Sequence, residues 1–208
     1  MYTVGRLPAL DCITTASASC CLWGRDMKTI TEKWFGDHFT ELHPKLQKLH
    51  SEGGVLSGEV KVEYGTGIAG VLGKRLGVKL GLPLHTESTS LKVDISHTDQ
   101  AMIWSRQFGG ASKPMVSEFT PQGNYESGYW AETTGAITVE LSVEVHLGGW
   151  HWIQRATKVK NLVVPVLLVP ELKAKKSFED NLYQFEVALN KRGLGLLVRY
   201  AGALEAGV

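Results

Sequence analysis

The chain has 208 residues, 43% of them hydrophobic, and its 22 Lys and Arg against 21 Asp and Glu give a formal net charge of +1. This length fits one domain, and the apolar fraction is enough for a core, which excludes a disordered chain. The near-neutral charge excludes a surface built to grip a phosphate backbone, so nucleic acid is not an expected partner. No apolar run approaches the roughly 20 residues that span a bilayer, so an integral membrane segment is not expected.

The first 26 residues differ from the rest of the chain. They contain all three cysteines, so the remaining fold depends on no disulfide, and a cytoplasmic location is expected. We interpret residues 1–26 as a leader or disordered N-terminal segment, and residues 27–208 as a single β-rich domain. Secretion is the minority alternative, because Asp11 interrupts the early apolar stretch.

Two short helices are expected at the start of the domain. The T-x-x-E sequence at residues 29–32 has the form of a capping box, which satisfies free N–H groups at a helix start. Pro44 suits the first turn of a second helix. Apolar residues across both segments recur near helical spacing: Ile30, Trp34, Leu42, Leu46 and Leu49. The histidines of this region, His38, His43 and His50, are expected to cap helices or lie on the surface.

From Val55 onward the apolar period becomes two, which is typical of strands with one dry and one wet face. The longest run alternates from Ile137 to Leu147, and glycine-rich turn sequences separate such runs. Counting the runs gives about eight to ten strands, enough for a barrel. We therefore predict an α+β fold that is mainly antiparallel β: a curved sheet or barrel with an N-terminal helical pair and one further helix.

The further helix is expected at residues 67–80. Its glycines lower helix propensity, so it needs packing to persist. It carries an apolar stripe and a basic group, namely Ile68, Val71, Leu72, Leu76 and Leu80, and Lys74, Arg75 and Lys79. We expect this helix to pack on the sheet; the alternative is that it touches a membrane surface.

Residues 65–70 match G-x-G-x-x-G between a strand and a helix, the pattern of a dinucleotide-binding turn. The context differs from that fold, because the preceding strand alternates, whereas a parallel Rossmann strand is apolar on both faces. We interpret the glycines as a plain strand-to-helix turn and expect no cofactor. No metal site is expected either, because the His and Cys residues lack ligand spacing.

An arginine stands on the apolar face of a predicted strand. By alternation, Met102, Trp104, Arg106 and Phe108 share one face. Burying a guanidinium among large apolar groups is costly unless it finds an anionic partner. Three interpretations follow: an inward salt bridge to a Glu or Asp, an arginine that snorkels at the mouth of the barrel, or a fork presented to the carboxylate or carbonyl of a ligand.

A second aromatic segment is Trp150-His151-Trp152, and its alternation does not say which face points inward.

Acid/base chemistry would need a titratable group beside the strand arginine, and the candidates are Asp94, Glu118 and His151.

A small basic run follows near residue 175. Its three lysines are expected in an exposed loop or edge: Lys173, Lys175 and Lys176. No nucleophile motif accompanies it or any other segment.

Several of these segments together resemble one bacterial family. They include G-L-P at residues 81–83, W-S-R-Q-F-G at residues 104–109 and G-L-L-V-R-Y-A-G at residues 195–202. The similarity covers residues 27–204, and the family is the one catalogued as domain of unknown function 4166. Members occur alone or joined to dehydrogenase-like Rossmann domains, which implies an accessory or substrate-handling role beside redox enzymes. The family has no established catalytic residues.

The leading hypothesis is a module that binds a small apolar or amphipathic molecule inside the barrel. Six residues are expected to contact the ligand: Met102, Trp104, Arg106, Phe108, His151 and Tyr200. One alternative is an acid/base enzyme, of isomerase, cyclase or hydrolase type, acting in the same cavity. The other is an interaction module that docks to a dehydrogenase-like reductase, for which a solid core and an exposed apolar patch are expected.

Overall fold

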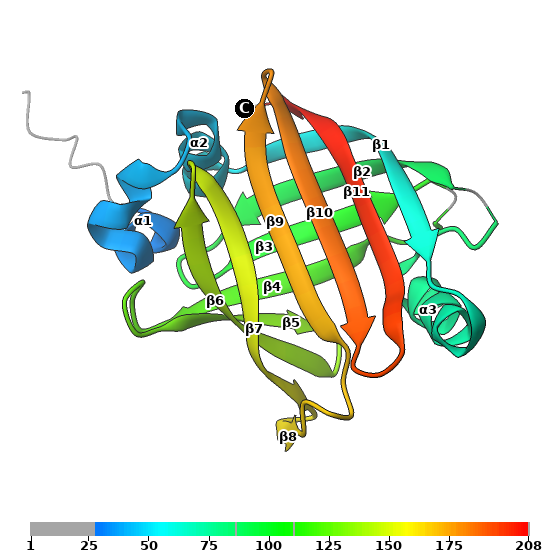
Figure 1. Cartoon of the computed structure of the whole chain (residues 1–208). Coiled ribbons are helices and arrows are strands. Elements are labelled where there is room, and N and C mark those ends of the chain that lie inside the picture. Colours follow the sequence, from blue (N-terminus) through cyan, green and yellow to red (C-terminus); the bar gives the residue numbers. More distant parts are fainter. Residues whose placement is uncertain (1–27, 86, 110, 208) are drawn as a thin grey trace, which may run out of the picture.

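A computed structural model describes residues 28–85, 87–109 and 111–207, so the predicted leader at residues 1–26 lies outside the described residues. The described chain forms a closed antiparallel β-barrel (Figure 1). Its ring follows the order β6-β5-β4-β3-β2-β1-β11-β10-β9-β7, and the pairing of β6 with β7 closes it. A short strand, β8, pairs with β7 outside this ring. The predicted barrel with an N-terminal helical pair and one further helix is confirmed.

The helices are short, and the strands form most of the fold. The helical elements are α1 (Ile30–Phe35), the 3-10 helix η1 (Gly36–Glu41), α2 (Pro44–Glu52) and α3 (Gly67–Leu80). The strands are β1 (Gly54–Tyr64), β2 (Ser88–His97), β3 (Met102–Phe108), β4 (Met115–Gln122), β5 (Tyr129–Thr134), β6 (Ile137–His146), β7 (Gly149–Val159), β8 (Leu162–Val164), β9 (Glu171–Glu179), β10 (Leu182–Lys191) and β11 (Gly195–Gly207).

Alternating residues separate the inside of the barrel from its outside. In β3, Met102, Trp104 and Phe108 are buried, as their shared face predicts. The same rule resolves the uncertain face of β7, where Trp150 and Trp152 point inward and His151 points outward.

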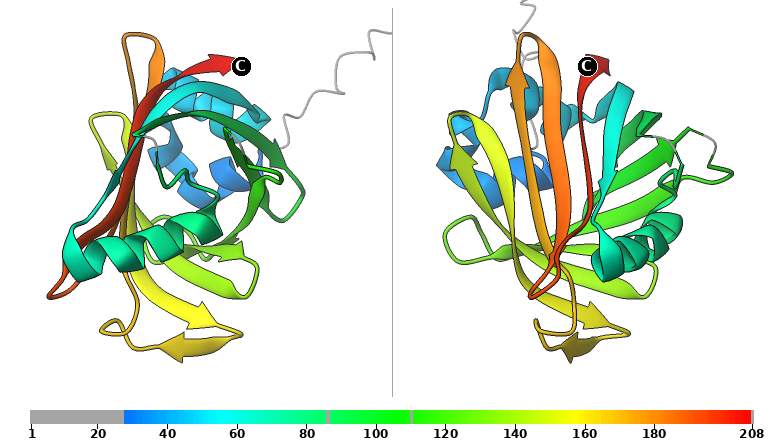
Figure 2. Two further views of the ribbon diagram at one scale, coloured as in Figure 1. Left: turned by 90° about the vertical axis from the view of Figure 1, so that its right-hand side faces the viewer. Right: turned by 45° about the vertical axis from the view of Figure 1, so that its right-hand side comes forward.

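The N-terminal helices cover one end of the barrel, away from α3 (Figure 2). The predicted capping box is present: the Thr29 backbone N–H donates to Glu32 Oε2 (2.6 Å), and the Glu32 N–H donates to Thr29 Oγ1 (3.3 Å). Pro44 begins α2, and the His43 ring caps it by accepting the Lys45 N–H. Apolar residues of these helices, Trp34, Phe35, Leu42, Leu46 and Leu49, are buried in the core.

Helix α3 packs on β11 and β1 through its glycines. A Cβ on Gly73 would collide with the Leu197 carbonyl oxygen, and one on Gly77 would collide with the Tyr64 hydroxyl. The glycine-rich turn and helix therefore serve close packing, because side chains here would hold the two backbones apart. The helix packs on the sheet as predicted, but through its glycines, so part of its apolar stripe faces solvent: Ile68 and Val71 are 70% and 55% exposed.

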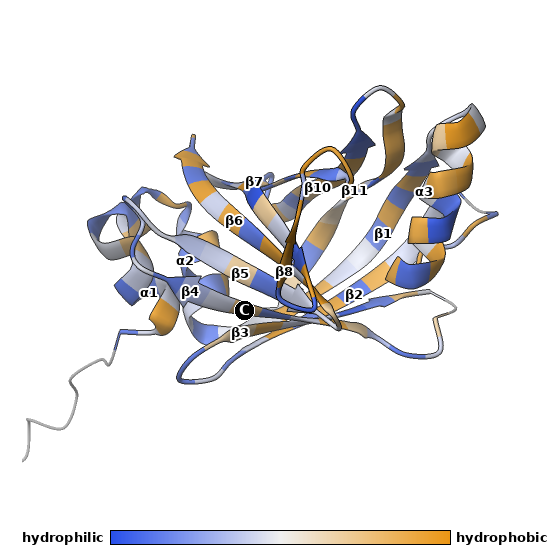
Figure 3. Ribbon diagram, turned by 90° about the horizontal axis from the view of Figure 1, so that it is seen from below, coloured by the Kyte–Doolittle hydropathy of each residue, from blue (hydrophilic) through white to orange (hydrophobic). Residues whose placement is uncertain are grey.

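The interior of the barrel has two unlike halves. The half beneath the N-terminal helices is filled by aromatic rings, for example Phe35 against Trp150 (centroids 4.7 Å apart) and Trp34 against Trp130 (5.5 Å). The other half, toward α3 and β8, contains a cavity, and Figure 3 shows hydrophobic residues on both elements at this end. No helix in the described part of the chain is long and apolar enough to cross a membrane.

Candidate functional site

The cavity in the hollow half of the barrel has a volume of about 520 Å³. Its walls are mainly aliphatic and come from strands around the ring and from α3, with members such as Leu80, Leu91, Val139, Leu172 and Val187. Polar residues also line it, and five of them are treated below: Arg106, Glu132, Lys176, Tyr183 and Tyr200. A mainly apolar cavity with a few placed polar groups is the usual form of a small-molecule site.

Arg106 is held inside the barrel by two neighbouring strands. Its Nη2 donates to Glu132 Oε1 (3.2 Å) from β5, and its Nη1 donates to Ser117 Oγ (2.8 Å) from β4. The guanidinium also lies 5.2 Å from the centroid of the Trp104 ring. Of the three sequence interpretations, the inward salt bridge is therefore present. It does not use all the guanidinium N–H groups, because arginine has five.

Lys176 is the second basic side chain of the interior and has no acidic partner among the described residues. Its side chain is 3% exposed, and its amino group makes no hydrogen bond among the described residues. Three indole rings surround the Nζ atom, with centroids 3.9 Å (Trp150), 4.6 Å (Trp104) and 5.1 Å (Trp152) away. Burial lowers the pKa of the Lys176 amino group well below its ordinary value, and the charge of Arg106 lowers it further.

The prediction that Lys173, Lys175 and Lys176 lie in an exposed loop or edge is wrong for Lys176. All three belong to β9, which pairs with β10 on one side and β7 on the other. Alternation along this strand directs the side chains of Lys173 and Lys175 outward and that of Lys176 inward.

Two tyrosines contribute hydroxyl groups to the same cavity. Tyr183 on β10 and Tyr200 on β11 are 2% and 6% exposed, and both line the cavity. Burial raises the pKa of both phenols, so both are neutral donors at physiological pH. Buried tyrosine hydroxyls usually have a partner, so these two offer hydrogen bonds to a molecule in the cavity.

His50 lies behind the aromatic wall of the cavity. Its ring is fully buried, with centroids 4.6 Å from Trp150 and 5.8 Å from Trp104. The prediction of a capping or surface role is wrong for this histidine, because it shares the inward face of α2 with Leu46 and Leu49. Burial lowers the pKa of His50 well below its ordinary value, so the ring is neutral.

The structure brings together half of the predicted ligand-contacting residues. Trp104, Arg106 and Tyr200 line the cavity. Met102 and Phe108 share the inward face of β3 and are buried, but they are outside the cavity lining. They instead fill the core.

His151 is a correction to the predicted ligand contacts. It borders the outer groove instead of the cavity, because its flanking tryptophans take the inward face of β7. Asp94 and Glu118, the other acid/base candidates, also lie on the outside of their strands, where Asp94 pairs with Lys92. The acid/base alternative therefore has none of its three residues beside Arg106.

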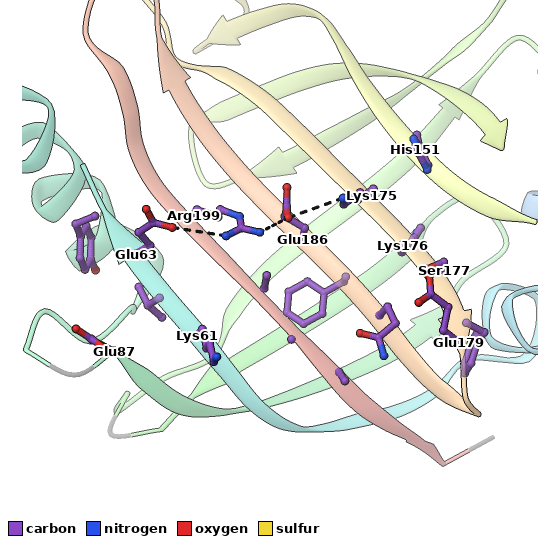
Figure 4. A pocket seen from close by; sticks show the side chains of 18 of the residues that line it. Lys61, Glu63, Glu87, His151, Lys175, Lys176, Ser177, Glu179, Glu186 and Arg199 are labelled. Atoms are coloured by element: carbon purple, nitrogen blue, oxygen red, sulfur yellow. Dashed lines mark hydrogen bonds and ion pairs between the residues drawn. The ribbon is translucent and has the colours of Figure 1, made fainter. Parts of the chain in front are cut away.

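A wider groove, of about 1240 Å³, lies on the outer face of β1, β11, β10 and β9 (Figure 4). Four of its charged side chains pair with one another: Arg199 donates to Glu186 and lies 3.5 Å from Glu63, and Lys175 lies 3.9 Å from Glu186. Arg199 lowers the pKa of Glu186 by donating this hydrogen bond. Because these charges neutralise one another on a solvated face, the interior cavity is the stronger candidate site.

Three polar residues of the cavity were missed in the sequence. Tyr183 is part of an alternating apolar run and could have been found from its shared face with Phe185. Glu132 gives no signal of its own, since its strand is short and mixed. Lys176 lies among other lysines, and such a basic run is typical of an exposed segment, so the sequence does not show that its side chain points inward.

Comparison with known proteins gives a family and a distant structural neighbour. Residues 42–204 match the family profile described as "Domain of unknown function (DUF4166)". No curated protein matches the chain. A crystal structure of Rv2717c from M. tuberculosis matches with a TM-score of 0.45 and 13% identity, covering 80% of this chain and 99% of that one.

Proposed function

The chain belongs to the DUF4166 family, and we propose that it binds one small amphipathic molecule inside its barrel. The apolar body of the ligand occupies the aliphatic cavity, whose volume of about 520 Å³ suits a small molecule. A polar head group then lies against Arg106, Lys176, Tyr183 and Tyr200.

The buried amino group of Lys176 is the observation that carries this proposal. A buried amino group without a hydrogen-bond partner is costly, and a protein retains one where a ligand completes its interactions. The polar groups around it are mostly donors, because Glu132 is already used by Arg106. An acidic or hydrogen-bond-accepting head group fits this set, and a carboxylate would also favour the protonated form of Lys176.

Titration with three amphiphiles that differ only in the head group tests the proposal. Trp104 and Trp152 line the cavity, so intrinsic tryptophan fluorescence reports on binding. We expect dodecanoate to bind more tightly than dodecanol, and dodecylamine to bind most weakly. Lys176→Met should reduce the affinity for dodecanoate by about tenfold or more, with little change for dodecanol.

The matched control is Lys175→Met, which removes the neighbouring lysine from the outer face of the same strand. This variant should bind all three amphiphiles like the wild type. The proposal is contradicted if no amphiphile gives a saturable change, or if Lys176→Met binds dodecanoate as tightly as the wild type does.

A further inference from the structure

Exposed apolar side chains gather on β8 and the turn that follows it. Leu162, Val163, Val166, Leu167 and Leu168 are each between 64% and 74% exposed. Single exposed apolar residues are common on protein surfaces, but this set lies within one short segment that projects beyond the barrel (Figure 1). A continuous patch of this kind marks an interaction surface.

Helix α3 presents a second apolar surface at the same end of the molecule (Figure 3). Because its glycine face packs on the barrel, the opposite side faces solvent with Ile68 and Val78, which are 70% and 62% exposed. We call these α3 residues, together with the β8 segment at residues 162–168, the apolar rim.

The apolar rim flanks one end of the cavity. That end is lined by Leu76 and Leu80 from α3 and by Val169 and Pro170 from the link between β8 and β9. The β8 segment is tied to the neighbouring β10–β11 turn, because Lys191 Nζ donates to the carbonyl oxygen of Leu167 (2.5 Å). The rim is therefore a fixed part of the barrel end.

Basic residues predominate at this end of the barrel. Exposed basic residues accompany each apolar element: Lys74, Arg75 and Lys79 on α3, Lys160 before β8 and Arg192 in the β10–β11 turn. Residues 66–80, 156–170 and 187–198 contain no Asp or Glu, and the exposed acidic residues just outside these ranges, Glu63 and Glu171, pair with Arg199 and Lys173. A chain with a net charge of only +1 thus concentrates positive charge around its apolar rim.

We propose that the apolar rim docks on the surface of an anionic lipid bilayer. Aliphatic side chains would enter the boundary between head groups and acyl chains, and the surrounding Lys and Arg would contact anionic head groups. The β8 segment contains no aromatic residue, whereas the centres of protein–protein interfaces are enriched in Tyr, Trp and Phe. This inference goes beyond ligand binding and does not depend on it.

Flotation of the protein with lipid vesicles tests the docking. Wild type should float with vesicles of phosphatidylcholine mixed with phosphatidylglycerol, and much less with phosphatidylcholine alone. Leu167→Asp/Leu168→Asp and Lys74→Glu/Arg75→Glu should each reduce binding by about tenfold or more. High salt should weaken the binding of wild type, because exposed charges are screened.

Matched controls change the other end of the barrel. Leu147, 92% exposed in the turn between β6 and β7, is changed by Leu147→Asp, and Lys33→Glu/Lys48→Glu gives the same net charge as the α3 variant. Both controls should float like wild type, and so should Lys176→Met, which separates docking from ligand binding. Wild type that stays in the soluble fraction, or equal losses in test and control variants, would overturn the proposal. If wild type does not float with vesicles, the apolar rim would instead be assigned to contact with a protein partner.

Discussion

The two halves of the barrel interior differ in what fills them. Beneath the N-terminal helices, aromatic rings pack on one another, and Trp130 and Trp150 are fully buried. Toward α3 and β8, aliphatic walls surround an empty volume into which Arg106 and Lys176 reach. The same ring of strands therefore supplies a packed core at one end and a site at the other.

The two halves of the interior therefore contribute differently to stability and to ligand binding. Dense aromatic packing stabilises the fold, because each buried ring removes a large apolar area from water. The half that contains the cavity lacks such packing and holds the Lys176 amino group, which has no hydrogen-bond partner among the described residues, and both features cost stability. Substitutions in the two halves should therefore have unlike effects.

The largest expected effect is on the filled half. Trp130→Ala should lower the free energy of unfolding by about 3–5 kcal/mol, because it opens a void among packed rings. Val187→Ala in the cavity wall should cost about 1 kcal/mol, because it only enlarges an existing space. Urea denaturation measures both values. Similar losses at the two sites would contradict the claim that the two halves of the interior are packed differently.

A change in the hollow half should do the opposite and stabilise the protein. Lys176→Met keeps the apolar stem and removes the buried amino group, so we expect a gain of about 1–2 kcal/mol at neutral pH in the absence of ligand. Urea denaturation again measures it, with Lys175→Met on the outer face as the control. A destabilised Lys176→Met protein would show that the amino group is a structural element and not a ligand contact.

The same variant should change the dependence of stability on pH. The pKa of Lys176 is lower in the folded chain than in the unfolded chain. The cost of protonating the buried Lys176 amino group is therefore absent above the ordinary lysine pKa of about 10.4. It lowers the stability of the fold increasingly as the pH falls toward the folded pKa. Wild-type stability should rise with pH in this window, and Lys176→Met should remove that part of the rise.

His50 gives the smallest of the expected effects, on the acid side. Its pKa is lowered by burial, so its contribution to stability is present above about pH 6.5 and is lost as the pH falls toward the folded pKa. His50→Leu should make the protein less sensitive to acid between about pH 7 and pH 5, as measured by urea midpoints. Part of the sensitivity should persist, because burial also lowers the pKa of His97 and His151.

The control for this measurement is His38→Gln. The pKa of exposed His38 is raised by hydrogen bonds to Glu126 and Glu41, so its effect on stability has the opposite sign. Equal acid sensitivity in wild type and His50→Leu would mean that the buried ring accepts a proton without loss of stability. That result would contradict the claim that His50 is buried in a tightly packed half of the barrel.

Much of the fold could be predicted from the sequence because its signals are local. The capping box at residues 29–32, Pro44 and the alternation along β3 and β6 depend on nearest neighbours, and the structure confirms each of them. The position of α3 could not be predicted in the same way. Glycines pack against another backbone only when the partner strand is known, and that strand, β11, lies more than a hundred residues later in the chain.

The site was only partly predictable for a related reason. The inward face of β3 placed Trp104 and Arg106 together, since period two is visible in a single strand. The partner of Arg106, Glu132, comes from a strand two positions away in the ring, and Lys176 comes from the opposite part of the barrel. Contacts across a closed barrel depend on the register of every strand between them, which one sequence does not reveal.

Native mass spectrometry of the chain purified from cells, followed by extraction of any bound molecule, tests the central claim most directly. We predict a single acidic amphiphile bound to the wild type in stoichiometric amount, and its loss from Lys176→Met. A wild-type mass that equals the bare chain, and that stays unchanged after addition of dodecanoate, would contradict the claim that the hollow half is a ligand site.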